Sequence, residues 1–247
     1  MGLLSAKTVL VTGALGSIGR VLVDQYRKEG ASVIALDLPG KEEIAASLFR
    51  PGSDLRYFGC DLNDLASSEK SVGDLADEVG GIDVLVHSAM LCLHKPHEDF
   101  DIEEYERHIR INSSATFVVS RACSKHMKQK GYGKIICLTS ISLNGQFEQL
   151  VPYVASKGAS YGLIKSMARE LGKHGINVNG ISPGSVRSDA EVAAFGHEQE
   201  LFDARVLAAQ SIKRRIEPLD VAHLAIFLSS SQADMISGQN IHCNGGW

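Results

Sequence analysis

The sequence predicts one α/β domain of the Rossmann type, with a parallel sheet of about seven strands and helices on both faces, in three layers. Short apolar runs rich in β-branched residues alternate along the chain with segments of helical periodicity. Strands separated by helices of this length join through right-handed crossovers and pair in parallel. The 247 residues are enough for one such domain with a large core, so we expect residues 1–247 to form a single unit.

The expected elements follow one another in regular alternation. The strands are expected at residues 7–12, 32–37, 55–59, 82–87, 134–139, 176–181 and 239–243. The helices are expected directly after Gly19 and at residues 65–79, 102–128, 152–174 and 218–229. Residues 188–215 are helical in pattern and charged, and they follow a Pro-Gly pair. We expect this stretch to fold over a site as a lid.

A glycine-rich turn joins the first strand to the first helix, and it predicts a dinucleotide site. Glycine allows the tight turn and lets the backbone approach a pyrophosphate closely, while the amides at the helix start favour negative charge. The context of strand, turn and helix gives the motif its weight. The residues expected to bind are Gly13, Leu15, Gly16, Ser17, Ile18 and Gly19.

Asp37 ends the second strand, 18 residues after Gly19. A carboxylate at this place accepts hydrogen bonds from the adenosine ribose and repels a 2′-phosphate. Neither Ala14 nor Leu15 is a cation that would attract such a phosphate. The sequence therefore favours NAD over NADP, against the alternative that Asp37 is only a polar strand end.

Tyr153 and Lys157 are a candidate catalytic pair, with Ser140 thirteen residues upstream of the tyrosine. On a helix, residues i and i+4 share one face, so both side chains can enter one pocket. A phenol titrates near about 10 in water, and a cation beside it favours the phenolate. Tyrosine and lysine at this spacing also occur on ordinary surface helices, so the pair gains weight from the dinucleotide site.

Composition excludes several other classes. The net charge of −4 argues against nucleic acid or an anionic membrane as the main partner. The five cysteines show no paired spacing, which favours reduced thiols in the cytoplasm. We see no signal peptide and no apolar run of the roughly 18 residues that a membrane span needs.

Together these residues resemble the short-chain dehydrogenase/reductase family, in its compact single-domain branch. The glycine turn, Asp37, Tyr153-x-x-x-Lys157 and Pro183-Gly184 carry the resemblance, which extends over nearly the whole chain to the tail at Ser237–Trp247. It also draws on Asn112 in a long helix and Ser140 after the fifth strand. It implies an NAD(H)-dependent oxidoreductase that interconverts a secondary alcohol and a ketone.

The resemblance also implies residue roles. Tyr153 would be the general acid/base, Lys157 would lower its pKa and hold the nicotinamide ribose, and Ser140 would bond the substrate oxygen. Asn112 would position a water that links Lys157 to solvent. Further cofactor contacts would come from Asp61, Leu62, Ser88, Ala89, Met90, Pro183, Gly184, Val186 and Ser188.

Several positions depart from the family pattern, including His87-Ser88 where Asn-Asn is usual. Gly16 and Gly19 stand three and six residues after Gly13, with Ser17 where the compact branch has glycine. The Ser17 hydroxyl could contact a phosphate. Met90 replaces a glycine near the cofactor and is expected to narrow the pocket. Asn244 stands where an acid is common.

Substrate and assembly are less determined. Apolar and polar groups mix in the segments 90–94, 141–149 and 188–215, which favours a polyol, a sugar derivative or a hydroxyacyl compound. Lys213, Arg214 and Arg215 could serve a carrier-protein substrate, so a 3-oxoacyl reductase remains an alternative, as does a non-catalytic dinucleotide-binding protein. His94 and His97 lack further ligands of matching spacing, so we expect no metal. The resemblance implies a homo-oligomer, a dimer or, as we expect, a homotetramer.

Overall fold

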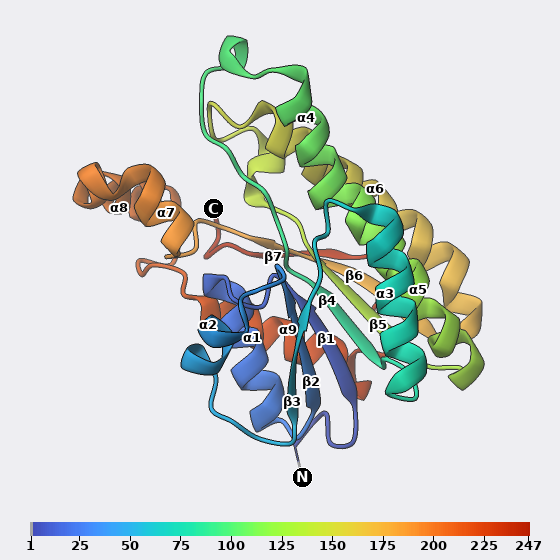
Figure 1. Ribbon diagram of the computed structural model, residues 1–247. Coiled ribbons are helices and arrows are strands. Elements are labelled where there is room, and N and C mark those ends of the chain that lie inside the picture. The colour runs from blue at the N-terminus through green and yellow to red at the C-terminus, as the bar shows by residue number, and fades with distance from the viewer. Residues whose placement is uncertain (1) are drawn as a thin grey trace.

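Seven parallel strands form one sheet in the order β3-β2-β1-β4-β5-β6-β7 (Figure 1). This computed structural model describes residues 2–247, apart from the side chains of Ala190, Ala193, Ala194 and His197. Met1, the first residue of the expected domain, lies outside the described part. The strands are Thr8–Thr12 (β1), Ser32–Asp37 (β2), Leu55–Gly59 (β3), Val84–His87 (β4), Gly133–Leu138 (β5), Ile176–Pro183 (β6) and Asn240–Cys243 (β7).

The inner strands are buried on both faces, which explains their nearly continuous apolar sequence. In β1, Val9 and Val11 face one side of the sheet and Leu10 faces the other, and none of the three is exposed to solvent. Each side chain therefore supports a different helical layer, because successive residues of a strand point to opposite faces. The predicted fold class is confirmed.

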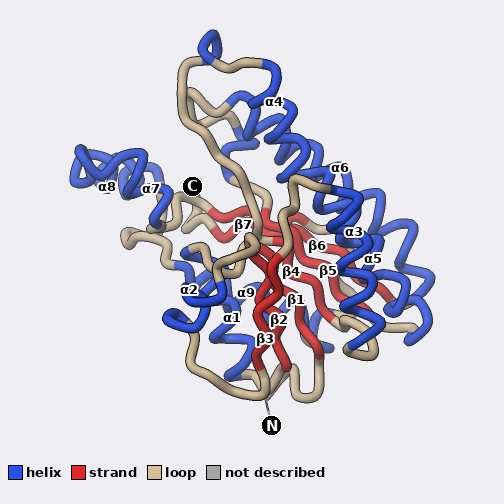
Figure 2. The backbone as a smooth tube through the Cα atoms, viewed as in Figure 1, coloured by secondary structure: helices blue, strands red, loops and turns tan. Residues whose placement is uncertain are grey.

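Nine helices are described within residues 2–247, and they cover both faces of the sheet (Figure 2). They are Ser17–Lys28 (α1), Glu42–Leu48 (α2), Leu65–Glu78 (α3), Ile102–Ile109 (α4), Ala115–Lys130 (α5), Val151–Leu171 (α6), Asp189–Phe195 (α7), Gln199–Ala209 (α8) and Pro218–Ser229 (α9). Helices α1 and α9 pack on one face, and α3, α5 and α6 pack on the other. Alternation implied a helix after the second strand without bounds, and this helix is α2, whose only buried residue is Ala45.

The expected helix 102–128 is interrupted by a π-helical segment, Arg110–Ser114, between α4 and α5. A capping box of Asp101 and Glu104 starts α4. Apolar periodicity continues across the interruption, so the sequence pattern alone showed one helix. Single π turns within α-helices are common at functional sites, and this one contains Asn112.

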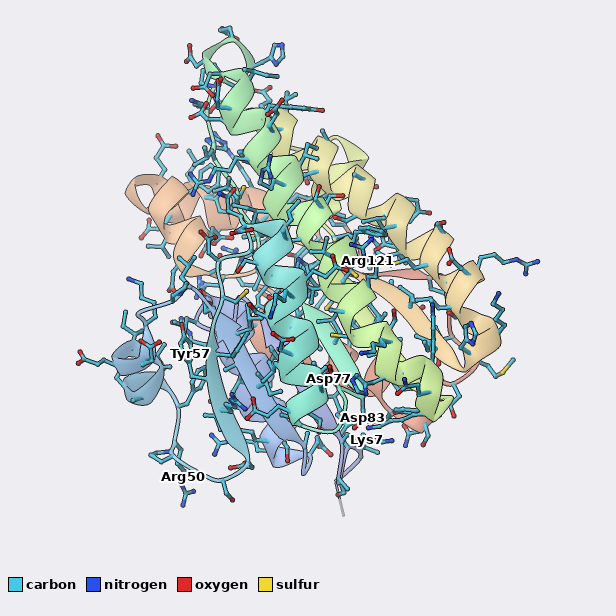
Figure 3. The ribbon with its side chains drawn as sticks, turned by 45° about the vertical axis from the view of Figure 1, so that its right-hand side comes forward. Lys7, Arg50, Tyr57, Asp77, Asp83 and Arg121 are labelled. Atoms are coloured by element: carbon cyan, nitrogen blue, oxygen red, sulfur yellow. The ribbon has the colours of Figure 1, made fainter. Side chains whose placement is uncertain are left out.

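The order of the strands creates a crevice at one edge of the sheet. The chain moves outward from β1 to β3 and then returns to β4 on the other side of β1, so the loops after β1 and β4 diverge. Lys7 and Asp83, labelled in Figure 3, mark the opposite edge, where Asp83 accepts a hydrogen bond from the Thr8 amide at 2.9 Å. The carboxyl ends of the strands therefore provide the place for a site.

Candidate active site

A cavity of about 570 Å³ lies at the carboxyl edge of the sheet. The predicted site residues that line it are Gly13, Leu15, Gly16, Ser17, Ile18, Gly19, Asp37, Asp61, Leu62, Ser88, Ala89, Met90, Ser140, Tyr153, Lys157, Pro183, Gly184, Val186 and Ser188. Asn112 does not line the cavity and lies behind its wall. The fold thus brings together side chains and turns that are far apart along the chain.

Other residues that line the cavity were not predicted. These are Leu36, Leu38, Cys60, Asn63, Leu91, Arg107, Ile111, Leu138, Thr139 and Asp189. Most of them are next to predicted residues in the sequence, and this proximity could have identified them. Arg107 and Ile111 are four residues apart on the helical stretch before Asn112, and the same-face rule could have grouped them.

The glycine turn needs glycine at two of its three positions. Gly13 has a φ of 65°, and a Cβ there would lie 2.7 Å from the Ala89 Cα. A Cβ on Gly19 would lie 2.0 Å from the Gly13 carbonyl oxygen. Gly16 is the N-cap of α1 and has room for a Cβ. Because Gly16 has no side chain to cap the helix, the first amides of α1 remain available to an anion.

The Ser17 hydroxyl is engaged by the protein itself. It accepts a hydrogen bond of 2.9 Å from the Asp189 amide at the start of α7. Arg20 forms an ion pair of 3.2 Å with the Asp189 carboxylate. Two bonds therefore connect the first turn of α1 to the segment expected to act as a lid. The expected contact between this hydroxyl and a phosphate remains a prediction.

The Asp37 carboxylate is fixed at the end of β2. One oxygen accepts from the Leu15 amide at 2.9 Å and the other from the Leu38 amide at 2.8 Å. These bonds hold the negative charge beside the glycine turn, and each oxygen keeps a lone pair for a further donor.

Tyr153, Lys157 and Ser140 meet at the inner end of the cavity. The two α6 residues are almost fully buried, with 8% of Tyr153 and 2% of Lys157 exposed. The Lys157 ammonium donates to the Leu138 carbonyl at 2.7 Å and lies 5.6 Å from the centre of the Tyr153 ring. The shared helical face predicted from the sequence is therefore present.

The hydrogen bonds that Ser140 accepts from Ser142 leave its proton available to the Tyr153 oxygen or to a ligand. Its oxygen accepts from the Ser142 amide at 3.1 Å and from the Ser142 hydroxyl at 2.8 Å. A hydroxyl has two acceptor sites and one donor, so both acceptor sites are taken. Ser140 can then donate to an oxygen placed beside Tyr153.

Burial shifts the pKa of both ionisable groups. It raises the pKa of the Tyr153 phenol above its ordinary value, which the Ser140 hydroxyl partly offsets. It also lowers the pKa of Lys157 to about 8. The expected lowering of the tyrosine pKa by Lys157 is not seen, because desolvation of the phenol dominates.

Asn112 is buried and holds the loop that follows β4. Its side-chain oxygen accepts from the Leu91 amide at 2.7 Å, and its amide donates to the Leu91 carbonyl and the Ser156 hydroxyl, both at 2.8 Å. Its own carbonyl accepts from Thr116 and Ser160. These contacts make Asn112 a positioning residue, and the expected bound water remains a prediction.

Helices α7 and α8 lie within the predicted range 188–215, and Asp189 at the start of α7 lines the cavity. Glu191 and Arg215 form an ion pair of 2.5 Å, and 6% of each side chain is exposed. Asp203 pairs with Arg215 and Arg187. Phe195 contacts His94 edge-on, with ring centres 5.2 Å apart. Within the described residues, no group of three or more His, Cys, Asp or Glu side chains could hold a metal ion.

Comparison with known proteins agrees with this geometry. A family model described as enoyl-(acyl carrier protein) reductase matches residues 13–247. The D-threitol dehydrogenase of Mycolicibacterium smegmatis is 34% identical over 99% of this chain and 94% of its own length. The 5-keto-D-gluconate 5-reductase of Escherichia coli K12 is 31% identical over 98% of this chain and 96% of its own.

Solved structures give the same result. A protein from Beutenbergia cavernae, described as an NAD(P)-dependent gluconate 5-dehydrogenase with NADP bound at low occupancy, superposes with a TM-score of 0.91. It is 29% identical, and the match covers 99% of this chain and 97% of the other. The chain belongs to the short-chain dehydrogenase/reductase family of oxidoreductases. The predicted resemblance is confirmed.

Proposed function

We propose that this protein is an NAD(H)-dependent oxidoreductase that interconverts a secondary alcohol and a ketone in a polyol or sugar derivative. The convergence of Ser140, Tyr153 and Lys157 at the inner end of the cavity carries the proposal. The glycine turn and Asp37 line the same cavity. A dinucleotide bound along these residues would have its reactive end beside the tyrosine.

The roles of the side chains follow from their bonds. The Ser140 proton is free to bond the substrate oxygen and stabilise charge that develops on it. Tyr153 takes the hydroxyl proton in oxidation and returns it in reduction. Lys157, with its pKa lowered to about 8, supplies a cation near the phenol and donors for ribose hydroxyls. A bound nicotinamide would accept or donate the hydride.

The preference for NAD rests on Asp37. Two backbone amides fix its carboxylate beside the glycine turn, where a 2′-phosphate would meet a negative charge. The NADP in the Beutenbergia cavernae protein belongs to that protein. Comparative titration of this chain with NADH and NADPH tests the preference.

The basic residues 213–215 do not favour a carrier-protein substrate. Arg214 pairs with Asp220, and Arg215 pairs with Glu191. Lys213 donates to the backbone carbonyls of residues 207, 208 and 210. These three residues therefore form no free cationic cluster for a carrier-protein substrate. The relatives named for threitol and keto-gluconate support a polyhydroxylated compound over a 3-oxoacyl one.

The Tyr153→Phe variant tests the mechanism. It removes the hydroxyl and keeps the ring, so we expect turnover to fall by a factor of about 100 or more while NADH binding persists. Calorimetry measures binding, and a screen of polyols, sugars and 3-oxoacyl compounds by NADH absorbance measures turnover. Full activity in the variant would exclude the mechanism, and binding without turnover in the wild type would favour a non-catalytic protein.

We further propose a cytoplasmic homotetramer. Phe117 of α5 and Tyr161 of α6 are large, exposed apolar side chains, and the family resemblance implies that these two helices form the subunit contacts. The cysteines are all free thiols, which agrees with a reducing compartment. No helix among the described residues is long and apolar enough to span a membrane. Light scattering that gives a monomer mass would exclude the assembly.

A further inference from the structure

The Met90 side chain lies directly beside the Tyr153 hydroxyl. The hydroxyl points at the Met90 sulfur, 3.8 Å away. Met90 lines the cavity, and 47% of it is exposed there. The thioether therefore occupies space next to the atom that exchanges a proton with the substrate.

The backbone that carries Met90 is held on its far side. Asn112 binds both the amide and the carbonyl of Leu91. The Leu93 amide donates to Nε2 of the buried His108 at 3.2 Å, and Nδ1 of that ring lies 2.6 Å from the Glu104 carbonyl. His108 therefore accepts from Leu93 through Nε2 and faces the Glu104 carbonyl through Nδ1.

These bonds restrict how Met90 can respond to a ligand. A shift of the loop would break contacts with Asn112 and His108, so the space beside Tyr153 changes mainly through the methionine side-chain torsions. Methionine is unbranched and can adapt its shape, but its volume remains in the cavity. A larger group on the substrate would have to compete with that volume.

We propose that Met90 is a specificity-determining residue. Its side chain restricts the substituent of the reacting carbon on the side that faces it to one carbon, such as methyl or hydroxymethyl. The substrate class is then an alcohol near the end of a polyhydroxylated chain, with the longer arm directed away from Met90. This inference rests on the proposed function.

The test compares two secondary alcohols that share one arm and differ in the other. One carries a methyl or hydroxymethyl group at the carbinol carbon, and the other carries a propyl or phenyl group. We expect Met90→Gly to raise the ratio of kcat/KM for the large substituent over the small one by at least about tenfold, the scale of one or more methylenes in an apolar pocket. The increase in kcat/KM for the large substituent should come mainly from a lower KM, because the clash with Met90 opposes binding.

Two control variants separate size from other effects. Met90→Leu keeps a similar volume, so its ratio should stay within about threefold of the wild type. Met235→Gly removes a methionine that is 96% exposed, and its ratio should not change. If the wild type turns over the small alcohol and Met90→Gly leaves the ratio unchanged, the inference fails while the proposed function stands.

A crystal structure of the wild-type protein with NADH tests the same point without turnover. We expect the Met90 sulfur to remain within about 4.5 Å of the Tyr153 hydroxyl oxygen, or of the part of the cavity that adjoins this oxygen. A methionine turned away from the tyrosine, with that space open, would overturn the inference. Absence of turnover with every alcohol would overturn the proposed function, and the crystal structure would still decide the place of Met90.

Discussion

At the scale of single residues, the role of each polar side chain in the site follows from which of its hydrogen-bond donors and acceptors the protein already uses. Ser140 has both acceptor sites filled from within the protein and keeps its proton for a ligand. Asn112 has its side chain and its carbonyl engaged by the protein, and so it positions a loop. Met90 fills space that glycine would leave open. Residue type alone does not distinguish these roles, since each depends on neighbours supplied by other elements.

At this scale we predict that the charge of Asp37 sets the preference for NADH over NADPH. In Asp37→Asn the shape is kept and the charge is lost, so a 2′-phosphate is no longer repelled. One acceptor for the backbone amides of Leu15 and Leu38 is also lost. We expect NADH affinity to fall, and the ratio of NADPH to NADH affinity to rise by about tenfold, or roughly 1.4 kcal/mol.

Calorimetric titration of the variant with both dinucleotides measures that ratio. Asp24→Asn removes the same charge from the neighbouring helix α1 and serves as the control. An unchanged ratio in Asp37→Asn would show that another group selects the cofactor.

At the scale of elements, the segment 188–215 is attached through the first turn of its first helix, α7. Ser17 and Arg20 bind Asp189 at the start of α7, and Arg215 binds Glu191 two residues later. Asp203 on α8 joins the same cluster. With Arg187, which also pairs with Asp203, these charges balance, which allows the charges of Glu191 and Arg215 to be almost fully buried. We propose that the segment closes over the substrate and that this cluster sets its position.

Glu191→Gln tests the role of the cluster. The change removes a charge-assisted hydrogen bond to Arg215, worth about 1.5–3 kcal/mol, and Asp203 retains part of the pairing. We expect faster limited proteolysis within residues 189–209 and a higher KM, with a smaller change in kcat.

Glu198→Gln is the matched control, because Glu198 is exposed in the same segment. Equal proteolysis rates for Glu191→Gln and the wild type would show that the cluster does not position the segment.

At the scale of the whole molecule, one buried imidazole links stability to pH. His87 at the end of β4 lies 3.1 Å from the Thr12 hydroxyl through Nδ1. That hydroxyl already accepts from the amides of Ser88 and Ala89, so it donates to Nδ1 and the ring carries its proton on Nε2. Burial, with the nearby charge of Lys157, lowers the pKa of His87 to about 3.

The pKa of His87 predicts loss of stability in acid. An unfolded histidine titrates near about 6.5, so between that pH and about 3 the unfolded chain binds more protons than the folded one. The contribution of His87 to the free energy of unfolding is therefore complete above about 6.5 and is lost as pH falls, by up to about 1.4 kcal/mol per pH unit. His87→Asn should show a smaller loss over the same range.

Urea unfolding at pH about 7 and about 4.5 measures this difference. His223→Asn changes an exposed histidine of α9 and provides the control. Equal losses of stability in the wild type and His87→Asn would contradict the prediction.

The sequence by itself determined the order of strands and helices, the glycine turn, the place of Asp37 and the helical spacing of Tyr153 and Lys157. All of these depend on interactions within a few residues, such as side-chain periodicity and the backbone freedom of glycine. Strand boundaries differed from expectation by at most two residues, as for β4, which begins at Val84.

Only the tertiary structure decided the features that need partners distant in sequence. These are the π turn around Asn112, the bond from Asp189 to Ser17, the buried pair of Glu191 and Arg215, and the place of Met90 beside Tyr153. Burial also reversed the expected shift of the tyrosine pKa. The desolvation of a side chain and the filling of its hydrogen-bond sites depend on which residues the fold packs against it. The local sequence pattern does not contain this information.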